Sequence, residues 1–409
     1  MFDKDKWQEI FSTIQKNKLR SFLTGFSVAW GIFMLIILLG SGQGLQNGVE
    51  TEFKQDAVNS IWLYPGQTSV AYQGYSLGRQ IRFTNNDYDE VANNTKDLEY
   101  ISAGFNIRGN GTISYKNEYG TFDIISCHPG YQQIENAILK EGRFVNNPDI
   151  EKYRKVTSIG QKVAEALFKD SANPIGKYIK VNGIPFEVVG VFTDPNERDM
   201  TRIYIPVSTA QMVFNGGNRI NRISLTTSGT PEESEKLVEQ IRKDFAKRHN
   251  FDPADMQAMF IRNTLKEYKQ MQNLFSGIRI FVWIIGIGTI IAGIVGVSNI
   301  MMIVVKERTK EIGIRKAIGA TPGSIVSLII MESVMITGFA GYVGLVLGVG
   351  LLQLLSKAME SVPFIKDPQA DFSVAIYATL LLIVSGALAG FVPANRAAMI
   401  KPIEALRDE

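Results

Sequence analysis

The chain has 409 residues, 45% of them hydrophobic, and a formal net charge of only +3. This length suffices for two or three domains, and the near-neutral charge favours neither a disordered chain nor a nucleic-acid-binding protein. A single cysteine, Cys127, excludes an internal disulfide and a cysteine-rich metal site, and two histidines leave little material for zinc or iron.

The N-terminal segment, residues 1–21, combines a short apolar pattern with lysine and arginine side chains. Five cations surround the apolar residues that fall on one helical face, which are Trp7, Ile10, Phe11 and Ile14. This spacing predicts an amphipathic helix lying on the cytoplasmic surface of a membrane, with a plain charged terminus as the alternative.

A first transmembrane helix is predicted over residues 22–41. Residues 22–40 contain no charged side chain, and a run of that length can cross a bilayer. A cleaved signal peptide would have a shorter apolar core and a small-x-small cleavage site, so an uncleaved anchor is preferred. Apolar residues then recur every four positions, which predicts that the helix continues outward as a stalk over residues 42–58.

Residues 59–262 predict an extracytoplasmic α+β domain. Helix-start signals stand at Thr84 and at Thr230-Pro231. Short strand patterns fill residues 109–206, where Asn182-Gly183 is typical of a two-residue hairpin turn and residues 161–169 are the one clear helix. We therefore expect a β-rich insertion flanked by strand–helix–strand units, whose common core is completed by segments far apart in the chain.

Three more apolar runs follow this domain. A second stalk over residues 263–279 leads into a second transmembrane helix over 280–305. A third helix over 322–355 and a fourth over 372–393 are joined by a short outer loop, 356–371. Small residues at four-residue spacing would let these helices approach their neighbours closely, and they are Ala340, Gly344, Gly348, Gly386 and Gly390.

Lysine and arginine are concentrated in the first 20 residues, in residues 306–316 and in the tail, 394–409. Because cytoplasmic loops carry an excess of these residues, the distribution predicts four spans with both termini in the cytoplasm. The large middle domain then lies outside, since a domain of that size is translocated largely regardless of its own charge.

The segment between the second and third spans, residues 306–321, holds five cations and two carboxylates. Read as a helix, it has Glu311 four residues before Arg315, which is the favourable order for an ion pair. Its apolar residues fall on one side, and they are Ile314, Ala317 and Ile318. A solvated positive loop is the alternative, but the apolar stripe favours a short cytoplasmic helix with a surface of its own.

Signals for catalysis are weak. The sequence contains no G-x-x-x-x-G-K-[ST] phosphate-binding loop, so no ATP site is predicted in it. Cys127-His128 suggests a nucleophile or a metal ligand, but with no other cysteine the pair is interpreted as structural. Glu332 is the only carboxylate well inside an apolar run, and a buried acid in a membrane is a functional candidate. Its position near the cytoplasmic end fits an interfacial or helix-packing role equally well.

Several blocks of the sequence resemble one protein family. They are KERTKEIGIRKAIGAT at residues 306–321, NKLRSFLT at 17–24, LKEGRF at 139–144, NPIGK at 173–177, VVGV at 188–191, PANRAA at 393–398 and PIEALR at 402–407. Together they resemble the MacB-type, FtsX-like permeases of ABC transporters, which include macrolide- and peptide-export permeases and lipoprotein-releasing permeases. The resemblance covers nearly the whole chain.

The resemblance implies four transmembrane helices with a large extracytoplasmic α+β domain, made of a porter-like part and a β-rich insertion. It also implies that residues 306–321 form a coupling helix seated on an ATPase. The residues that would contact the ATPase are Glu307, Arg308, Glu311, Ile312, Gly313, Arg315 and Ala317, with secondary contacts from Arg396 and Arg407. No catalytic, cofactor or metal site is implied in this chain.

The implied function is that of a permease subunit in the cytoplasmic (inner) membrane. The ATPase domain fused ahead of the permease in macrolide exporters is missing from these residues, so we expect a separate ATPase subunit that binds ATP and Mg²⁺. A homodimer or heterodimer is implied, and a periplasmic adaptor with an outer-membrane channel is left open. Lipoprotein release and FtsX-like control of a cell-wall hydrolase are the alternatives to export of a peptide or drug, and a membrane-anchored enzyme is disfavoured.

Overall fold

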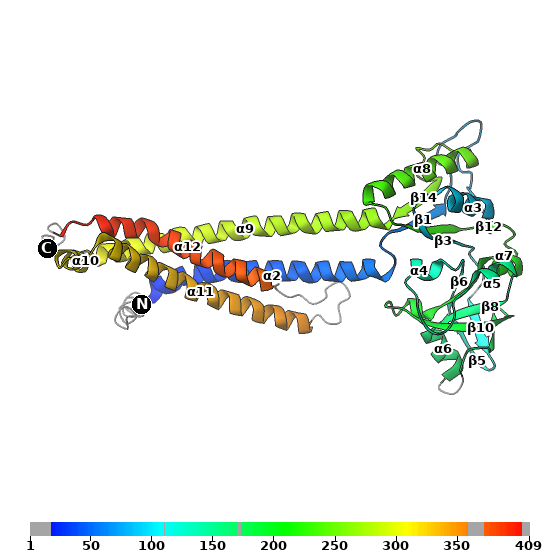
Figure 1. Cartoon of the computed structure of the whole chain (residues 1–409), viewed down its shortest axis with the longest axis horizontal. Helices are drawn as coiled ribbons and strands as arrows, with labels where there is room; N and C mark the ends of the chain where they lie inside the picture. Colours follow the sequence, from blue (N-terminus) through cyan, green and yellow to red (C-terminus); the bar gives the residue numbers. More distant parts are fainter. Residues whose placement is uncertain (1–17, 110, 170–172, 359–371, 403–409) are drawn as a thin grey trace. The chain divides into compact units, whose positions relative to one another are not determined.

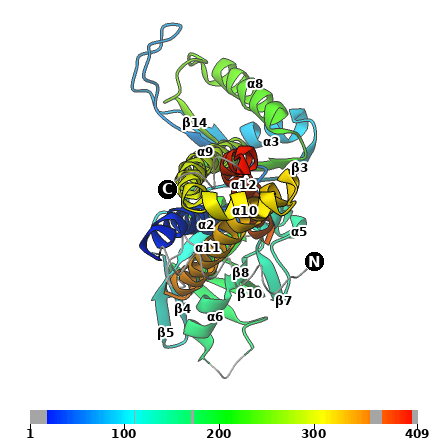
Figure 2. The same ribbon diagram turned by 90° about the vertical axis from the view of Figure 1, so that its left-hand side faces the viewer.

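A computed structural model of the chain describes residues 18–109, 111–169, 173–358 and 372–402 (Figures 1 and 2). The chain divides into two compact units. The helical unit comprises residues 1–50 and 273–409, and the α/β unit comprises residues 51–272. Most of the predicted N-terminal helix, most of the outer loop and the end of the tail, with Arg407, lie outside the described residues.

The helical unit is built from long apolar helices. Among the described residues, four helices are long and apolar enough to cross a membrane, and two of them also enter the α/β unit. They are α2 (Lys18–Gln55), α9 (Thr264–Glu307), α11 (Pro322–Ala358) and α12 (Phe372–Met399). Because α2 and α9 are unbroken, each covers both a predicted stalk and a predicted transmembrane span (Figure 1).

Small residues set the spacing between helices in this unit. A Cβ atom on Gly344 would collide with the backbone of Ala29 in α2, and one on Gly348 would press against Ile36. Gly386 and Gly390 bring α12 against α11 in the same way, and Ala340 is buried. The small residues whose four-residue spacing predicted close helix approach therefore lie where two helices are in close contact.

One part of the α/β unit is an antiparallel sheet of four strands in the order β14-β1-β13-β3. The strands are β1 (Ser60–Pro65), β3 (Leu98–Gly104), β13 (Arg222–Thr227) and β14 (Met259–Asn263). Two helices pack on this sheet, α3 (Asn85–Asn94) and α8 (Pro231–His249). Its core joins segments from both ends of the unit, as the sequence predicted.

The second part is a sheet of eight strands in the order β5-β4-β9-β10-β8-β11-β6, with β7 also paired to β10. The strands are β4 (Thr112–Tyr115), β5 (Glu118–Thr121), β6 (Asp123–Cys127), β7 (Ile138–Gly142), β8 (Val156–Gly160), β9 (Tyr178–Val181), β10 (Ile184–Thr193) and β11 (Arg202–Pro206). Asn182-Gly183 turns β9 into β10, and both residues have positive φ, as that hairpin turn requires. A two-stranded ribbon pairs β2 (Phe83–Thr84) with β12 (Arg219–Ile220).

Short helices connect these strands. They are α4 (Tyr131–Ile134), α5 (Asn147–Glu151), α6 (Gln161–Phe168), the 3₁₀ turn η2 (Asp199–Thr201) and α7 (Val207–Val213). The prediction of one clear helix in residues 109–206 was therefore incomplete. A single turn such as α4 is too short to show a helical period, and α5 depends on a capping box between Asn146 and Asp149.

Candidate coupling surface on α10

A short helix, α10 (Thr309–Ala317), connects α9 to α11. Its start is marked by Arg308, and the Thr309 hydroxyl donates to the carbonyl oxygen of Lys306 over 2.8 Å. At its end Gly319 adopts φ +107°, which lets the amide of Ala320 donate to the carbonyl of Arg315 at 3.0 Å. Residues 306–321, for which a short cytoplasmic helix was predicted, therefore contain a separate helix with defined ends.

The inner side of α10 packs against the long helices. Ile312 is buried in a cluster with Met301, Ile325 and Ile329, and Gly313 is buried beside it. Ile312 and Gly313 were both predicted to contact an ATPase. Both residues are buried, so they lie on the side of α10 that packs against the long helices. An apolar side chain and a glycine allow close packing there.

A run of ion pairs ties α10 to α11. Arg308 Nη1 lies 3.4 Å from Glu332 Oε2, and its Nε lies 3.3 Å from Glu311 Oε2. Glu311 Oε1 accepts a hydrogen bond from Arg315 at 3.0 Å, so the predicted pair is present. Glu332 is only 2% exposed, and a buried carboxylate needs such a partner. The structure thus favours the helix-packing role for this acid.

Lys316 ties the other end of α10 to α12. Its Nζ donates to the backbone carbonyl oxygens of Ala398 and Ile400, at 2.5 and 2.8 Å. A lysine at a helix C-terminus satisfies carbonyl groups that have no partner within the helix and interacts favourably with the helix dipole. The sequence did not predict this role, because the acceptors are backbone atoms. The available signal was the positive charge of Lys316, which lies beside the residues predicted to contact an ATPase.

The outer side of α10 is exposed and partly apolar. Ile318 is 82% exposed and Ile314 is 43% exposed, while Ala317 lies between them on the same face. Glu307 and Glu311 are also exposed, and Arg308 and Arg315 are half-buried. The predicted stripe therefore lies on the exposed side of α10, opposite the buried Ile312 and Gly313. Arg396, in α12, is exposed as well.

Cys127 and His128 form no reactive pair. The His128 ring stacks on Tyr88, with ring centroids 4.1 Å apart, and its Nδ1 accepts a hydrogen bond from the amide of Ala103 at 3.0 Å. Burial lowers the pKa of His128 to about 4 and raises the pKa of the Cys127 thiol well above its usual range. Both groups are therefore neutral near pH 7, which supports the structural interpretation.

Comparison with known proteins identifies two family domains in the chain. The sequence profile of the MacB-like periplasmic core domain matches residues 21–244, and that of the FtsX-like permease C-terminal domain matches residues 283–402. These matches agree with the resemblance found in the sequence blocks.

Two relatives are both named macrolide export ATP-binding/permease protein MacB. The protein from Chlorobaculum tepidum is 30% identical over 98% of this chain, and that from Bdellovibrio bacteriovorus is 29% identical over 98%. The chain spans 61% of the length of each.

Solved structures to which part of the chain is similar include the periplasmic region of MacB from Actinobacillus actinomycetemcomitans. It has 20% identity and a TM-score of 0.43, and the match covers 54% of this chain and 96% of that one. The extracellular domain of the transporter YknZ from Gram-positive bacteria has 20% identity and a TM-score of 0.42, covering 50% of this chain and all of that one. On the two family matches, the chain belongs to the ABC transporter permeases that join a MacB-like periplasmic core domain to an FtsX-like permease domain, and it is a membrane protein with a large domain of the periplasmic type.

Proposed function

We propose that this chain is a permease subunit that converts ATP-driven motion of a separate ATPase into movement of its extracytoplasmic domain. The observation that carries the proposal is the two-sided character of α10. Its inner side is fixed to α11 by Arg308 and to α12 by Lys316, and its outer side exposes Ile314 and Ile318. An exposed apolar stripe with charged neighbours is typical of a protein-binding surface.

Energy enters through the ATPase in this proposal. In this proposal ATP and Mg²⁺ bind on the ATPase, and no phosphate-binding loop lies in these 409 residues. A partner can shift the permease between two states only if it binds them with different affinity. The ion pairs and backbone hydrogen bonds of α10 give its displacement a route into α11 and α12, and the unbroken helices α2 and α9 lead into the α/β unit.

We further propose that both termini are cytoplasmic, that the membrane is the inner membrane, and that two permease chains form a dimer. The lysine and arginine distribution supports the orientation. Export of a peptide, a drug or another periplasmic substrate is the favoured task, because the relatives are named as macrolide exporters. Lipoprotein release and control of a cell-wall hydrolase are the other tasks within this family, and co-purified periplasmic proteins would distinguish among them.

The docking surface is tested by Ile318→Glu in the full chain, reconstituted with its ATPase. A charge at this 82% exposed position should leave folding intact but disrupt an apolar contact. Loss of a hot-spot residue at the centre of an interface costs about 2 kcal/mol or more, and 2 kcal/mol corresponds to roughly thirtyfold in affinity. We expect loss of ATPase co-purification and of permease-stimulated ATP hydrolysis.

The matched control is Ile318→Leu, which keeps the apolar surface and should bind and stimulate the ATPase normally. Unchanged binding of the ATPase by Ile318→Glu would contradict docking through this face of α10.

A further inference from the structure

A cavity of about 800 Å³ opens in the α/β unit, on the eight-stranded sheet. Because β8 occupies one edge of β10, two strands share the other edge, β9 along residues 184–187 and β7 along residues 190–193. The cavity lies between these two strands, where β7 ends at Gly142 and β9 begins at Tyr178. Its volume is within the range of small-molecule sites, about 300–1,000 Å³.

Backbone geometry fixes the first cation at this cavity. Gly142 adopts φ +74°, and a Cβ atom there would collide with the carbonyl oxygen of Val189. The glycine therefore lets the end of β7 lie close against β10, where the amide of Arg143 donates to that carbonyl oxygen at 2.9 Å. Arg143 is thus placed in the wall of the cavity, together with Arg154 and Lys155, which precede β8.

A buried carboxylate holds two of these cations in place. Asp149 is fully buried, and it accepts hydrogen bonds from Arg143 Nη1 and Nη2 at 2.5 and 3.1 Å. Arg154 Nη1 lies 3.7 Å from the same carboxylate. The two arginine side chains stay 38% and 47% exposed, and a guanidinium has five N–H donors. Both groups are therefore preorganised and still have donors for an anion in the cavity.

The cavity wall carries more positive than negative charge. Lys155 is exposed, and its ammonium group forms no ion pair with the described residues. Among the described residues that line the cavity, the only carboxylate is that of Glu187. With the buried Asp149 included, three cations face two carboxylates, which leaves an excess of one positive charge. A singly charged carboxylate balances this excess, whereas a phosphate monoester carries about −1.5 to −2 at pH 7.

Apolar side chains complete the wall of the cavity. They come from Val156 in β8, from Val189 in β10 and from Ile175 in the segment before β9. Tyr178, which is 61% exposed, borders the same opening. Apolar and aromatic side chains beside a few charged groups are typical of sites for small organic ligands. The wall thus offers contacts to both ends of a molecule that joins a carboxylate to an apolar group.

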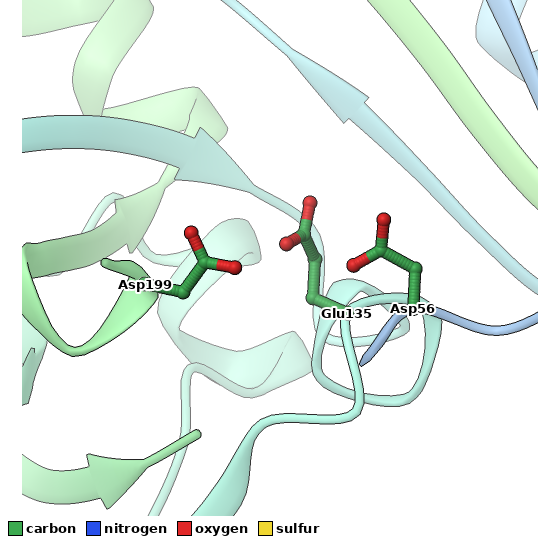
Figure 3. Close-up of side chains that lie close together, drawn as sticks. All are labelled: Asp56, Glu135 and Asp199. Atoms are coloured by element: carbon green, nitrogen blue, oxygen red, sulfur yellow. The ribbon is translucent and has the colours of Figure 1, made fainter. Parts of the chain in front are cut away.

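Another charged cluster in this unit is neutralised within the fold. Asp56, Glu135 and Asp199 each contribute one oxygen to a group that lies within 4.8 Å (Figure 3). Arg202 pairs with Glu135 at 2.6 Å and with Asp199 at 2.5 Å, and the Tyr131 hydroxyl donates to Glu135 at 2.5 Å. Partners within the protein therefore hold this cluster together, whereas the cations of the cavity keep exposed donors.

We propose that the cavity binds a small organic carboxylate, with its charged end at the three cations and its apolar part against Tyr178. Arginine recognises a carboxylate through parallel N–H···O bonds, which makes such a site selective for the charged end. The ligand is either a free small molecule or the C-terminus of a short peptide, because both present the same carboxylate. This binding is separate from the proposed coupling to an ATPase.

The test is equilibrium dialysis of the full chain in detergent, with detergent buffer alone as the blank. N-acetylphenylalanine represents a peptide C-terminus, and 3-phenylpropanoate represents a free carboxylate with the same apolar group. We expect one saturable site per chain, and the tighter of the two ligands identifies which source the site prefers. The uncharged amide of that ligand should bind at least about tenfold more weakly, because it lacks the charge-assisted hydrogen bonds.

Variants test the charged wall. Lys155→Glu should abolish saturable binding but leave the Tm unchanged, because Lys155 is exposed. Lys152→Glu makes the same change at an exposed position outside the wall, so it should bind normally. Glu187→Gln should tighten binding, because it removes a negative charge from the wall.

Three results would overturn the proposal. They are the absence of saturable binding for both carboxylates, equal binding of the matching amide, and an equal loss of binding in Lys152→Glu, which would reduce the effect to general surface charge. Weaker binding by Glu187→Gln would contradict the charge balance assigned to the wall. No ATPase is present in these measurements, so their failure leaves the proposed coupling untouched.

Discussion

At the scale of single residues, the buried carboxylate of Glu332 has a cationic partner. Glu332 is 2% exposed in α11, and its Oε2 lies 3.4 Å from Arg308. Removing one partner of a buried pair leaves an uncompensated charge, which typically costs about 3–5 kcal/mol. Arg308 therefore has a structural role in addition to its position at the start of α10.

His128 provides a residue-scale prediction about pH. Its pKa is lowered from 6.5 to about 4 in the folded protein, so below pH 6.5 the unfolded chain binds a proton that the folded chain does not. Stability should therefore be complete above pH 6.5 and fall as the pH decreases towards 4, by up to about 3 kcal/mol. Chemical denaturation of the full chain in detergent between pH 4 and 7.5 measures this slope.

The matched variant is His128→Gln, which retains an acceptor for the amide of Ala103 but cannot be protonated. It should show a shallower loss of stability below pH 6.5. An unchanged slope would mean that other groups account for the pH dependence.

At the scale of elements, α10 is held at both ends by side chains that reach other helices. Arg308 contacts α11, and Lys316 donates to two carbonyl groups at the end of α12. The apolar stripe of α10 points the other way. A helix with a free face and fixed ends can pass a displacement to its neighbours as a nearly rigid body.

Lys316→Met tests this transmission. The change removes two charge-assisted hydrogen bonds, each typically contributing about 1.5–3 kcal/mol, but leaves Ile314 and Ile318 in place. We expect the ATPase to bind normally while stimulated ATP hydrolysis falls, measured in reconstituted vesicles. Lys310→Met, which removes an exposed charge from the same helix, is the control and should keep full stimulation. Loss of ATPase binding in Lys316→Met would assign Lys316 to docking instead.

At the scale of the whole molecule, the proposed orientation puts residue 77 outside the membrane and residue 310 in the cytoplasm. Cys127 is buried, so an introduced cysteine reports its own position. In intact cells, a membrane-impermeant maleimide should label Leu77→Cys, which is 66% exposed in the α/β unit, and should not label Lys310→Cys. Lys310→Cys should become labelled once the membrane is permeabilised. The reverse pattern would contradict cytoplasmic termini.

Patterns local in sequence predicted much of this protein. Long apolar runs marked the four long helices, because a lipid-spanning helix must be predominantly apolar over its length. Thr84 and Thr230 marked helix starts through capping boxes with residues three positions later. The family resemblance rested on contiguous blocks and was confirmed by the two domain matches.

Only the tertiary structure decided which groups meet across long distances in the chain. No periodic pattern in the sequence predicts the strand order of the eight-stranded sheet, the backbone acceptors of Lys316 or the meeting of Asp56, Glu135 and Asp199. The structure also decided that Ile312 faces inward and Ile318 outward, although both lie in the same amphipathic segment. The physical reason is that periodicity records the secondary structure of one segment, whereas packing, pairing and charge balance depend on neighbours that the fold brings together.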